Sequence, residues 1–241
     1  MSKDEKYREA LRNIEDFTFD RSVSQVFDDM IDRSVPGYRT LIANIGPIAS
    51  TFITPHSHCY DLGCSHGAGA LSIFKSLKAE NATIFAIDNA IAMIDECNRM
   101  INKEHAGDTI KTCQSSIQDT EISNASFVLL NLTLQFIPIN NRNEIIQKIF
   151  DGLNKGGACL ITEKIIMEDA SVDQKFKELH ENFKFANQYS QLEISQKRKA
   201  LENVLLREDL QTHKNRLSNA GFSTVTVWFQ CINFVSILAI K

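Results

Sequence analysis

The stretch that decides the fold is CYDLGCSHGAGA, residues 59–70. Apolar residues run into a glycine-rich turn and then into a helix start, as at a buried strand that leads through a loop into a helix. Gly63, Gly67 and Gly69 follow a GxxxGxG spacing rather than the GxGxxG of dinucleotide-binding loops. Glycines let the backbone approach a ligand, and free N–H groups at a helix start attract anions. The stretch therefore predicts a ligand-binding loop that does not hold NAD.

An acidic residue stands at the end of the next predicted strand. This residue is Asp88, which follows the strand TIFAID at 83–88. A carboxylate there can accept hydrogen bonds from both hydroxyls of a ribose. The alternative is a purely structural turn, with Asp88 as the cap of the following helix.

Outward from the loop, strands and helices alternate. Strands are expected at 58–63, 83–88, 110–115, 125–134, 157–165, 224–230 and 234–240, and helices at 70–77, 90–101, 142–153 and 211–222. Helical crossovers join parallel strands, whereas the last two strands lack a helix between them and must pair antiparallel. The prediction is an α/β fold with a doubly wound, mostly parallel seven-stranded sheet and an antiparallel final strand.

The 241 residues are expected to form a single domain. Residues 1–57 are assigned to an N-terminal helical cap, 58–163 and 217–241 to the sheet core, and 164–216 to a helical insertion. In the cap, apolar residues from Val23 to Ile31 recur at helical spacing, Pro36 and Gly37 interrupt the pattern, and a second amphipathic helix is expected over 40–53. An insertion at 164–216 would lie near the carboxyl ends of the strands, where open α/β sheets bind ligands.

Composition excludes several classes of protein. The formal net charge of −4 argues against a chain that binds tRNA or DNA by itself. The six cysteines show no CxxC spacing and are expected to be free thiols in a reducing cytoplasm. No apolar run reaches the roughly 20 residues of a membrane span, and the histidines show no metal-ligand spacing.

Several motifs carry a resemblance to a known family. DLGCS, AIDN, LNLTLQF and LNKGGACLI fall where S-adenosylmethionine-dependent methyltransferases of class I have their first four sheet motifs. A second set of motifs narrows the resemblance to one family within this class. Over nearly the whole chain, the sequence resembles the carboxy-S-adenosylmethionine synthase family in DLGCS and AIDN together with RSVPGY, NLTLQF, EISQKR and WFQC.

The resemblance implies a homodimer that converts S-adenosylmethionine and prephenate to carboxy-S-adenosylmethionine and phenylpyruvate without a metal. Prephenate aromatises and releases carbon dioxide, and the base so generated removes a proton from the sulfonium methyl group, whose carbon then attacks carbon dioxide. Water must be excluded from such a site. A separate enzyme would carry the carboxymethyl group to the wobble uridine of tRNA.

The resemblance also implies the site residues. Those that would contact S-adenosylmethionine or the transferred group are Tyr38, Gly63, Cys64, Ser65, Asp88, Asn89, Ser116, Ile117, Asn131 and Arg198. The family commonly has an acid at the position of Ser116, and a hydroxyl is a weaker acceptor than a carboxylate for the adenine amine. His66 replaces a commonly apolar residue. Ser65 is expected to offer its N–H and hydroxyl to the amino-acid end of the ligand.

Arg198 and Tyr38 are the candidate catalytic residues. Arg198 recurs with Ile194, Leu201 and Leu205 on one predicted helix face, an unusual place for a charge. Its head could reach water or pair with Glu202. The resemblance implies instead that its guanidinium binds a carboxylate bidentately, from the neighbouring subunit of the dimer. Tyr38 could donate a hydroxyl proton there, or be a half-buried aromatic below a helix.

Two other functions share these features. An ordinary methyltransferase acting on a small molecule would have the same loop and the same acid, but would not need Arg198 and Tyr38. The other is a degenerate, non-catalytic subunit that binds S-adenosylmethionine and scaffolds a partner, and the intact loop and acid argue against it.

Overall fold

The computed structural model describes residues 2–241. Its seven strands form one sheet in the order β3-β2-β1-β4-β5-β7-β6. Their bounds are β1 His58–Leu62, β2 Thr83–Asp88, β3 Ile110–Gln114, β4 Ala125–Asn131, β5 Leu153–Lys164, β6 Thr224–Cys231 and β7 Phe234–Ile240.

The pairing of the strands confirms the predicted fold. The pairs β1–β2, β2–β3, β1–β4 and β4–β5 are parallel, and β7 runs antiparallel to both β5 and β6. Only Ile232 and Asn233 separate β6 from β7, so the chain must reverse there. The class I methyltransferase arrangement expected from the motifs is therefore present.

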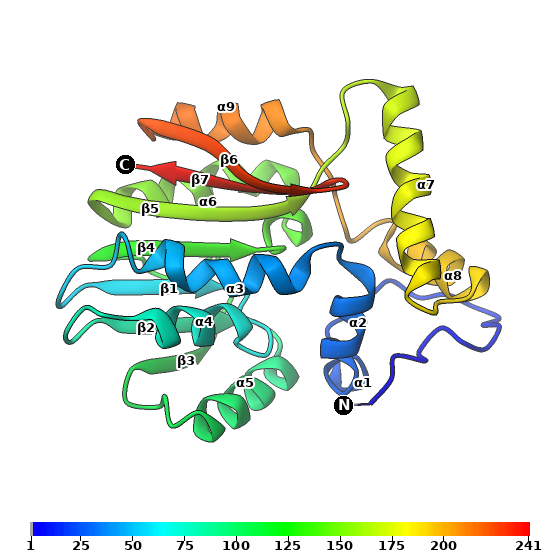
Figure 1. Ribbon diagram of the computed structural model, residues 1–241, viewed down its shortest axis with the longest axis horizontal. Coiled ribbons are helices and arrows are strands. Elements are labelled where there is room, and N and C mark those ends of the chain that lie inside the picture. The colour runs from blue at the N-terminus through cyan, green and yellow to red at the C-terminus, as the bar shows by residue number, and fades with distance from the viewer. Residues whose placement is uncertain (1) are drawn as a thin grey trace.

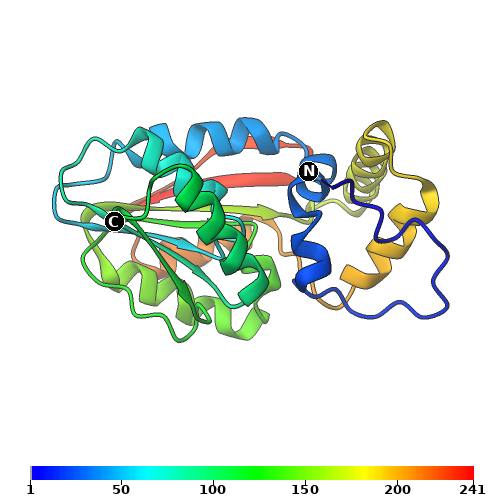
Figure 2. The same cartoon turned by 90° about the horizontal axis from the view of Figure 1, so that it is seen from below.

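Helices cover both faces of the sheet (Figures 1 and 2). The first face carries α3 (Tyr38–Ala49), α4 (Ala68–Ser76) and α5 (Ile91–Lys103), packed over one apolar cluster. The second carries α6 (Ile139–Gly152) and α9 (Leu210–Ala220), packed over another. Six of the seven residues of β4 are buried, as expected for a central strand covered on both faces.

A close contact between α3 and α4 fixes the position of α3. A Cβ atom on Gly46 would lie 2.1 Å from the carbonyl oxygen of Ser72, so only glycine fits here. The Ser72 hydroxyl donates to the carbonyl oxygen of Ile42 and accepts from the Gly46 N–H, which inserts a side chain into the helical ladder just before Pro47. Because Tyr38 begins α3, this contact also helps to place Tyr38.

The remaining helices lie at the carboxyl edge of the parallel strands. They are α1 (Arg21–Ser24), α2 (Phe27–Ser34), α7 (Ala170–Ala186) and α8 (Gln191–Leu201), and a 3-10 helix, η1 (Leu134–Phe136), follows β4. The single helix expected through Val23–Ile31 is wrong, because the chain breaks between α1 and α2. Leu205 lies beyond the end of α8, so the expected helical face of Arg198 is shorter than predicted.

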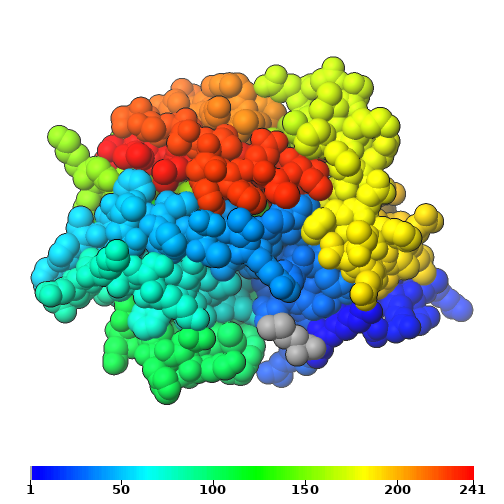
Figure 3. Space-filling model, in the orientation of Figure 1, coloured from blue at the N-terminus to red at the C-terminus, as the bar shows by residue number. Residues whose placement is uncertain are grey.

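The N-terminal segment is bound to α8. Gln196 accepts from the Leu11 N–H and donates to the carbonyl oxygens of Tyr7 and Glu9, and the Phe17 N–H donates to the Ala200 carbonyl. Figure 3 shows these two segments, blue and yellow, in contact at one end of the molecule. The division of the chain into cap, core and insertion stays a prediction.

Among residues 2–241, the six cysteines are free thiols. Between residues 2 and 241, no helix combines the length and the apolar character that crossing a membrane requires.

Candidate active site

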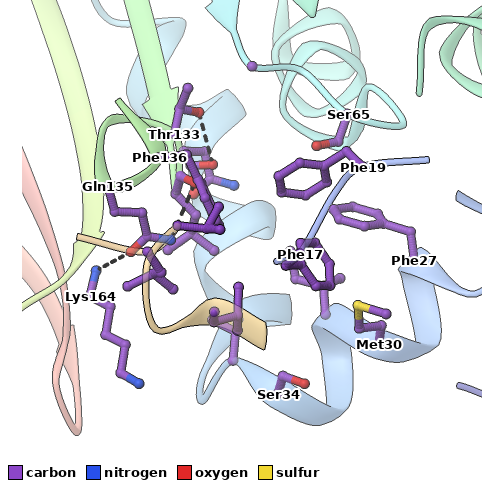
Figure 4. A pocket seen from close by; sticks show the side chains of 18 of the residues that line it. Phe17, Phe19, Phe27, Met30, Ser34, Ser65, Thr133, Gln135, Phe136 and Lys164 are labelled. Atoms are coloured by element: carbon purple, nitrogen blue, oxygen red, sulfur yellow. Dashed lines mark hydrogen bonds between the residues drawn. The ribbon is translucent and has the colours of Figure 1, made fainter. Parts of the chain in front are cut away.

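A cavity of about 860 Å³ opens at the carboxyl edge of the sheet. Its size falls in the range of small-molecule binding sites. The glycine loop and β4 form its inner side, and residues of the N-terminal segment, α2, α7, α8 and η1 line its outer side. Phenylalanines gather on one wall (Figure 4), and the residues of this wall are Phe17, Phe19, Phe27, Met30 and Phe136. Such a wall keeps water from part of the cavity.

The glycine loop enters the cavity with three left-handed residues. The φ angles are 80° at Gly63, 47° at Ser65 and 80° at Gly67. A Cβ on Gly63 would lie 2.5 Å from the side chain of Thr133, so this position needs glycine for space as well as for its dihedral angles. Other nucleotide-binding loops have a glycine at the position of Ser65. Here Ser65 adopts the left-handed conformation instead.

Asp88 holds this loop in place. Its side chain is 8% exposed, and it accepts hydrogen bonds from the Ser65 N–H at 2.9 Å and the Ala90 N–H at 2.9 Å, one on each oxygen. Burial raises the pKa of Asp88, and the two N–H groups oppose that effect. Each carboxylate oxygen keeps a second lone pair, so the side chain can still accept from the hydroxyls of a ribose. The expectation that the Ser65 N–H serves the ligand is wrong, because this N–H already donates to Asp88.

A second buried acid lines the cavity beside the loop. Asp61 accepts from the Ala70 N–H at 2.8 Å, and burial raises its pKa to about 7. A Cβ on Gly69 would lie 2.7 Å from its Oδ2 atom, so the helix start wraps closely around the carboxyl group. The sequence analysis did not predict Asp61 as a site residue. Its position at the end of a strand, directly before Leu62 and Gly63 of the loop, is the feature that could have identified it.

An unpaired amide oxygen also lines the cavity. Asn131 ends β4, and its Oδ1 atom is buried without a hydrogen-bond partner among residues 2–241. A buried acceptor of this kind costs free energy until a donor reaches it. An amino group of a ligand would satisfy Asn131, and the acid Asp61 favours a positively charged one.

The structure brings the predicted site residues together, with one exception. The residues that line the cavity are Tyr38, Gly63, Cys64, Ser65, Asp88, Asn89, Ile117, Asn131 and Arg198. Ser116 does not line it; the Ser116 hydroxyl donates to Gln118 Oε1 at 2.8 Å. Its neighbours Ser115 and Gln118 line the cavity instead. The adenine contact inferred for the Ser116 side chain has no support in this arrangement.

Tyr38 and Arg198 occupy different surroundings. The Tyr38 hydroxyl makes no hydrogen bond to any residue from 2 to 241, and burial raises the pKa of Tyr38, so the phenol is a neutral donor. Arg198 is exposed at the cavity rim and donates to Glu181 Oε1 at 2.8 Å. The alternative in which Arg198 pairs with Glu202 is wrong, since Glu202 accepts from Lys199. An exposed ion pair of this kind is weak, so Arg198 can exchange Glu181 for another carboxylate.

His66 connects the loop to the N-terminal helices, a role that the sequence did not predict. Its Nδ1 atom lies 2.9 Å from Asp28 Oδ1 in α2, and its Nε2 atom lies 3.1 Å from Ser24 Oγ in α1. The bond to His66 lowers the pKa of Asp28. An apolar side chain at this position could not make either contact. In this chain, polar contacts of His66 therefore connect α1 and α2 to the glycine loop.

Within the part of the chain that the structure describes, no group of three or more His, Cys, Asp and Glu side chains is arranged to hold a metal ion.

Comparison with known sequences points to one family. A family model described as a methyltransferase domain matches residues 53–223. The chain is 46% identical to the carboxy-S-adenosyl-L-methionine synthase of Actinobacillus pleuropneumoniae serotype 5b over 241 residues, which is all of both chains. It is 46% identical over 239 residues to the protein of the same name from Vibrio cholerae serotype O1, covering 99% of this chain and 97% of that one.

Comparison with solved structures supports the fold alone. An O-methyltransferase family protein from Burkholderia thailandensis superposes with a TM-score of 0.67 at 14% identity, over 95% of this chain and 65% of that chain. Human N-acetylserotonin methyltransferase superposes with a TM-score of 0.59 at 16% identity, over 92% and 55%.

Proposed function

The chain belongs to the carboxy-S-adenosyl-L-methionine synthase family of methyltransferase-like enzymes, and from this premise we propose that it converts S-adenosylmethionine and prephenate to carboxy-S-adenosylmethionine and phenylpyruvate. The observation that carries the proposal is that Tyr38 and Arg198 line the same cavity as the glycine loop and Asp88. An ordinary methyltransferase needs the loop and the acid, but not a guanidinium fork and a neutral phenol at the other end.

The fit of S-adenosylmethionine supports this assignment. Asp88 offers free lone pairs to the ribose hydroxyls, and the Ile117 region lines the cavity next to it. The amino group of the methionine part would satisfy the unpaired Asn131 oxygen, with Asp61 in the same cavity as a balancing acid. A Cβ atom on Gly63 would clash with the Thr133 side chain, so glycine lets the loop backbone lie against the residues that follow β4, at the edge of the cavity.

The reaction balances without a protein base. Prephenate loses carbon dioxide and hydroxide as its ring becomes aromatic, the hydroxide takes one proton from the sulfonium methyl group, and that methyl carbon forms a bond to carbon dioxide. The protein must then bind the carboxylates, keep water out and hold the methyl group close. Arg198 and Tyr38 suit the first task, and the phenylalanine wall suits the second.

Mass spectrometry tests the proposal. Purified protein, S-adenosylmethionine and prephenate labelled with ¹³C in its ring carboxylate should give phenylpyruvate and a labelled species heavier than S-adenosylmethionine by one carbon dioxide. A product without the label, or methyl transfer to another compound with no use of prephenate, would favour the ordinary methyltransferase instead.

The partners belong to the same proposal. The chain acts as a homodimer and passes its product to a separate tRNA-modifying enzyme. It does not bind tRNA itself, consistent with the net charge of −4. Tight, salt-sensitive tRNA binding in a gel-shift experiment would contradict this part.

A further inference from the structure

Two lysines at one end of the cavity have no partner. Lys164 is the last residue of β5, and Lys184 lies in the last turn of α7; both line the cavity. Neither Nζ atom reaches a carboxylate or any other hydrogen-bond acceptor in residues 2–241, although Lys184 is only 8% exposed. Figure 4 shows the Lys164 side chain extending along this part of the cavity. A buried ammonium is costly unless something pairs with it.

The neighbouring acids are already engaged with other cations. Arg207 and Lys177 both contact Asp173, at 3.3 and 2.8 Å, so this carboxylate is used on both oxygens. Glu181 pairs with Arg198 at 2.8 Å, Glu202 pairs with Lys199, and Asp4 lies 3.4 Å from Lys197. This end of the cavity therefore has positive charge that the acids around it do not balance.

The pKa values report this excess of positive charge. Burial, together with the charges of Lys184 and Arg207, lowers the pKa of Lys164 to about 7, against the opposing effect of Asp173 and Glu181. Burial lowers the pKa of Lys184 to about 8. As the pH rises, Lys164 therefore loses its proton before Lys184 does. A neutral Lys164 no longer repels the ammonium group of Lys184. His180 adds no charge, because burial and the nearby lysines lower its pKa to about 2 and its Nε2 donates to the Ser34 carbonyl at 2.7 Å.

We propose that Lys164 and Lys184 form a subsite for the carboxylates of an acidic second substrate, a small dianion. The inference rests on the proposed function, in which a dicarboxylate reacts with S-adenosylmethionine. Two unpaired ammonium groups match two negative charges. Phe234, whose ring lies 5.8 Å from the Lys164 Nζ atom, gives the same subsite an apolar side.

A carboxylate at this subsite could also come from the methionine part of S-adenosylmethionine. Substitution separates the two sources. Lys164→Met and Lys184→Met should each raise the KM for prephenate by at least about tenfold, since a hydrogen bond to a charged group is lost in each. The KM for S-adenosylmethionine should stay within about twofold. Lys175→Met is the matched control, because Lys175 is an exposed residue of α7 that pairs with Glu178; it should change neither value.

The pH dependence gives a readout that a structural role would not produce. The KM for prephenate in the unsubstituted protein should rise about tenfold per pH unit above pH 7–8, as the Lys164 ammonium loses its proton. Lys164→Arg should keep the affinity and flatten this rise, because a guanidinium stays charged. A rise of unchanged slope in Lys164→Arg would overturn the assignment.

Calorimetry keeps this inference separate from the proposed function. The protein is loaded with S-adenosylhomocysteine, which has no methyl group to react, and titrated with prephenate. Binding that is lost in Lys164→Met supports the subsite even if no carboxylated product ever forms. Equal binding of prephenate by Lys164→Met and the unsubstituted protein, or no binding by either, overturns the subsite. So does a rise in KM that is confined to S-adenosylmethionine in the kinetic experiment.

Discussion

Asp88 holds the glycine loop through its carboxylate, and we assign the remaining lone pairs of the same carboxylate to a ribose. Asp88→Ala should weaken binding of S-adenosylhomocysteine by about 1.5–3 kcal/mol, the range for hydrogen bonds to a charged group. The Ser65 and Ala90 N–H groups also lose their acceptor. Titration calorimetry measures the effect, and Asp95→Ala, a change of an exposed acid on α5, is the control. Equal affinity in Asp88→Ala and Asp95→Ala would contradict the ribose assignment.

Individual residues show where the sequence was sufficient. The acid at the end of β2 and the glycines after β1 were predicted, because their spacing along the chain fixes their place at the sheet edge. Lys164 could not be predicted to be unpaired, since pairing depends on acids from α7 and the N-terminal segment. The contacts of His66 could not be predicted for the same reason, because Ser24 and Asp28 are distant from it in the sequence.

At the scale of elements, α8 anchors the N-terminal segment through Gln196. This side chain is 4% exposed and bonds to the backbone of Tyr7, Glu9 and Leu11. Gln196→Ala should leave these backbone groups unpaired and speed hydrogen exchange and proteolysis in residues 2–19, at a cost of about 1–3 kcal/mol per buried group left unsatisfied. Gln191→Ala, an exposed position of α8, should cause no such change. Equal protection in the two variants would show that the segment is held by other contacts.

The helices at the cavity were the least predictable elements. The apolar spacing from Val23 to Ile31 indicates one helix, but Asp20 caps a first short helix and the chain restarts at Phe27. The periodicity of Arg198 suggested burial, whereas its side chain is exposed and bonded to α7. The spacing of apolar residues predicts which residues share one face of a helix, but not which elements pack against that face. Here those elements are distant in the sequence.

For the whole molecule, the main prediction concerns Arg198, which lies at the rim of its own chain's cavity but which the family resemblance assigns to the site of the neighbouring subunit. An Asp88→Ala chain and an Arg198→Ala chain, each inactive alone, are mixed under conditions where dimers exchange. If Arg198 acts across the subunit interface, a mixed dimer has one intact site and activity returns in part. Arg198→Ala should leave binding of S-adenosylmethionine nearly unchanged. An inactive mixture with verified exchange would place Arg198 in the site of its own chain.

Two buried histidines predict loss of stability in acid. Burial, aided by the charge of Arg216, lowers the pKa of His213 to about 4, and His180 is lowered to about 2. Below the ordinary pKa of about 6.5 the unfolded chain takes up protons that the folded chain does not, so the free energy of unfolding falls as the pH drops from 6.5 toward 4. Each histidine contributes a slope of about 1.4 kcal/mol per pH unit.

Urea unfolding between pH 7 and 4.5 measures this slope. His213→Gln should reduce it by the share of one histidine. His56→Asn, at an exposed position, should leave it unchanged. A slope in His213→Gln equal to that of the unsubstituted protein would rule out His213 as a source.

The place of β7 between β5 and β6 has a consequence for synthesis on the ribosome. Strand β7 follows all the others in the chain, yet it pairs with β5 on one side and β6 on the other. Until it emerges, β5 presents an open edge to other nascent chains and β6 has no sheet to join. Ribosomes that stall after Gly221 should therefore carry chains that aggregate or recruit chaperones, and release from such chaperones should coincide with the insertion of β7.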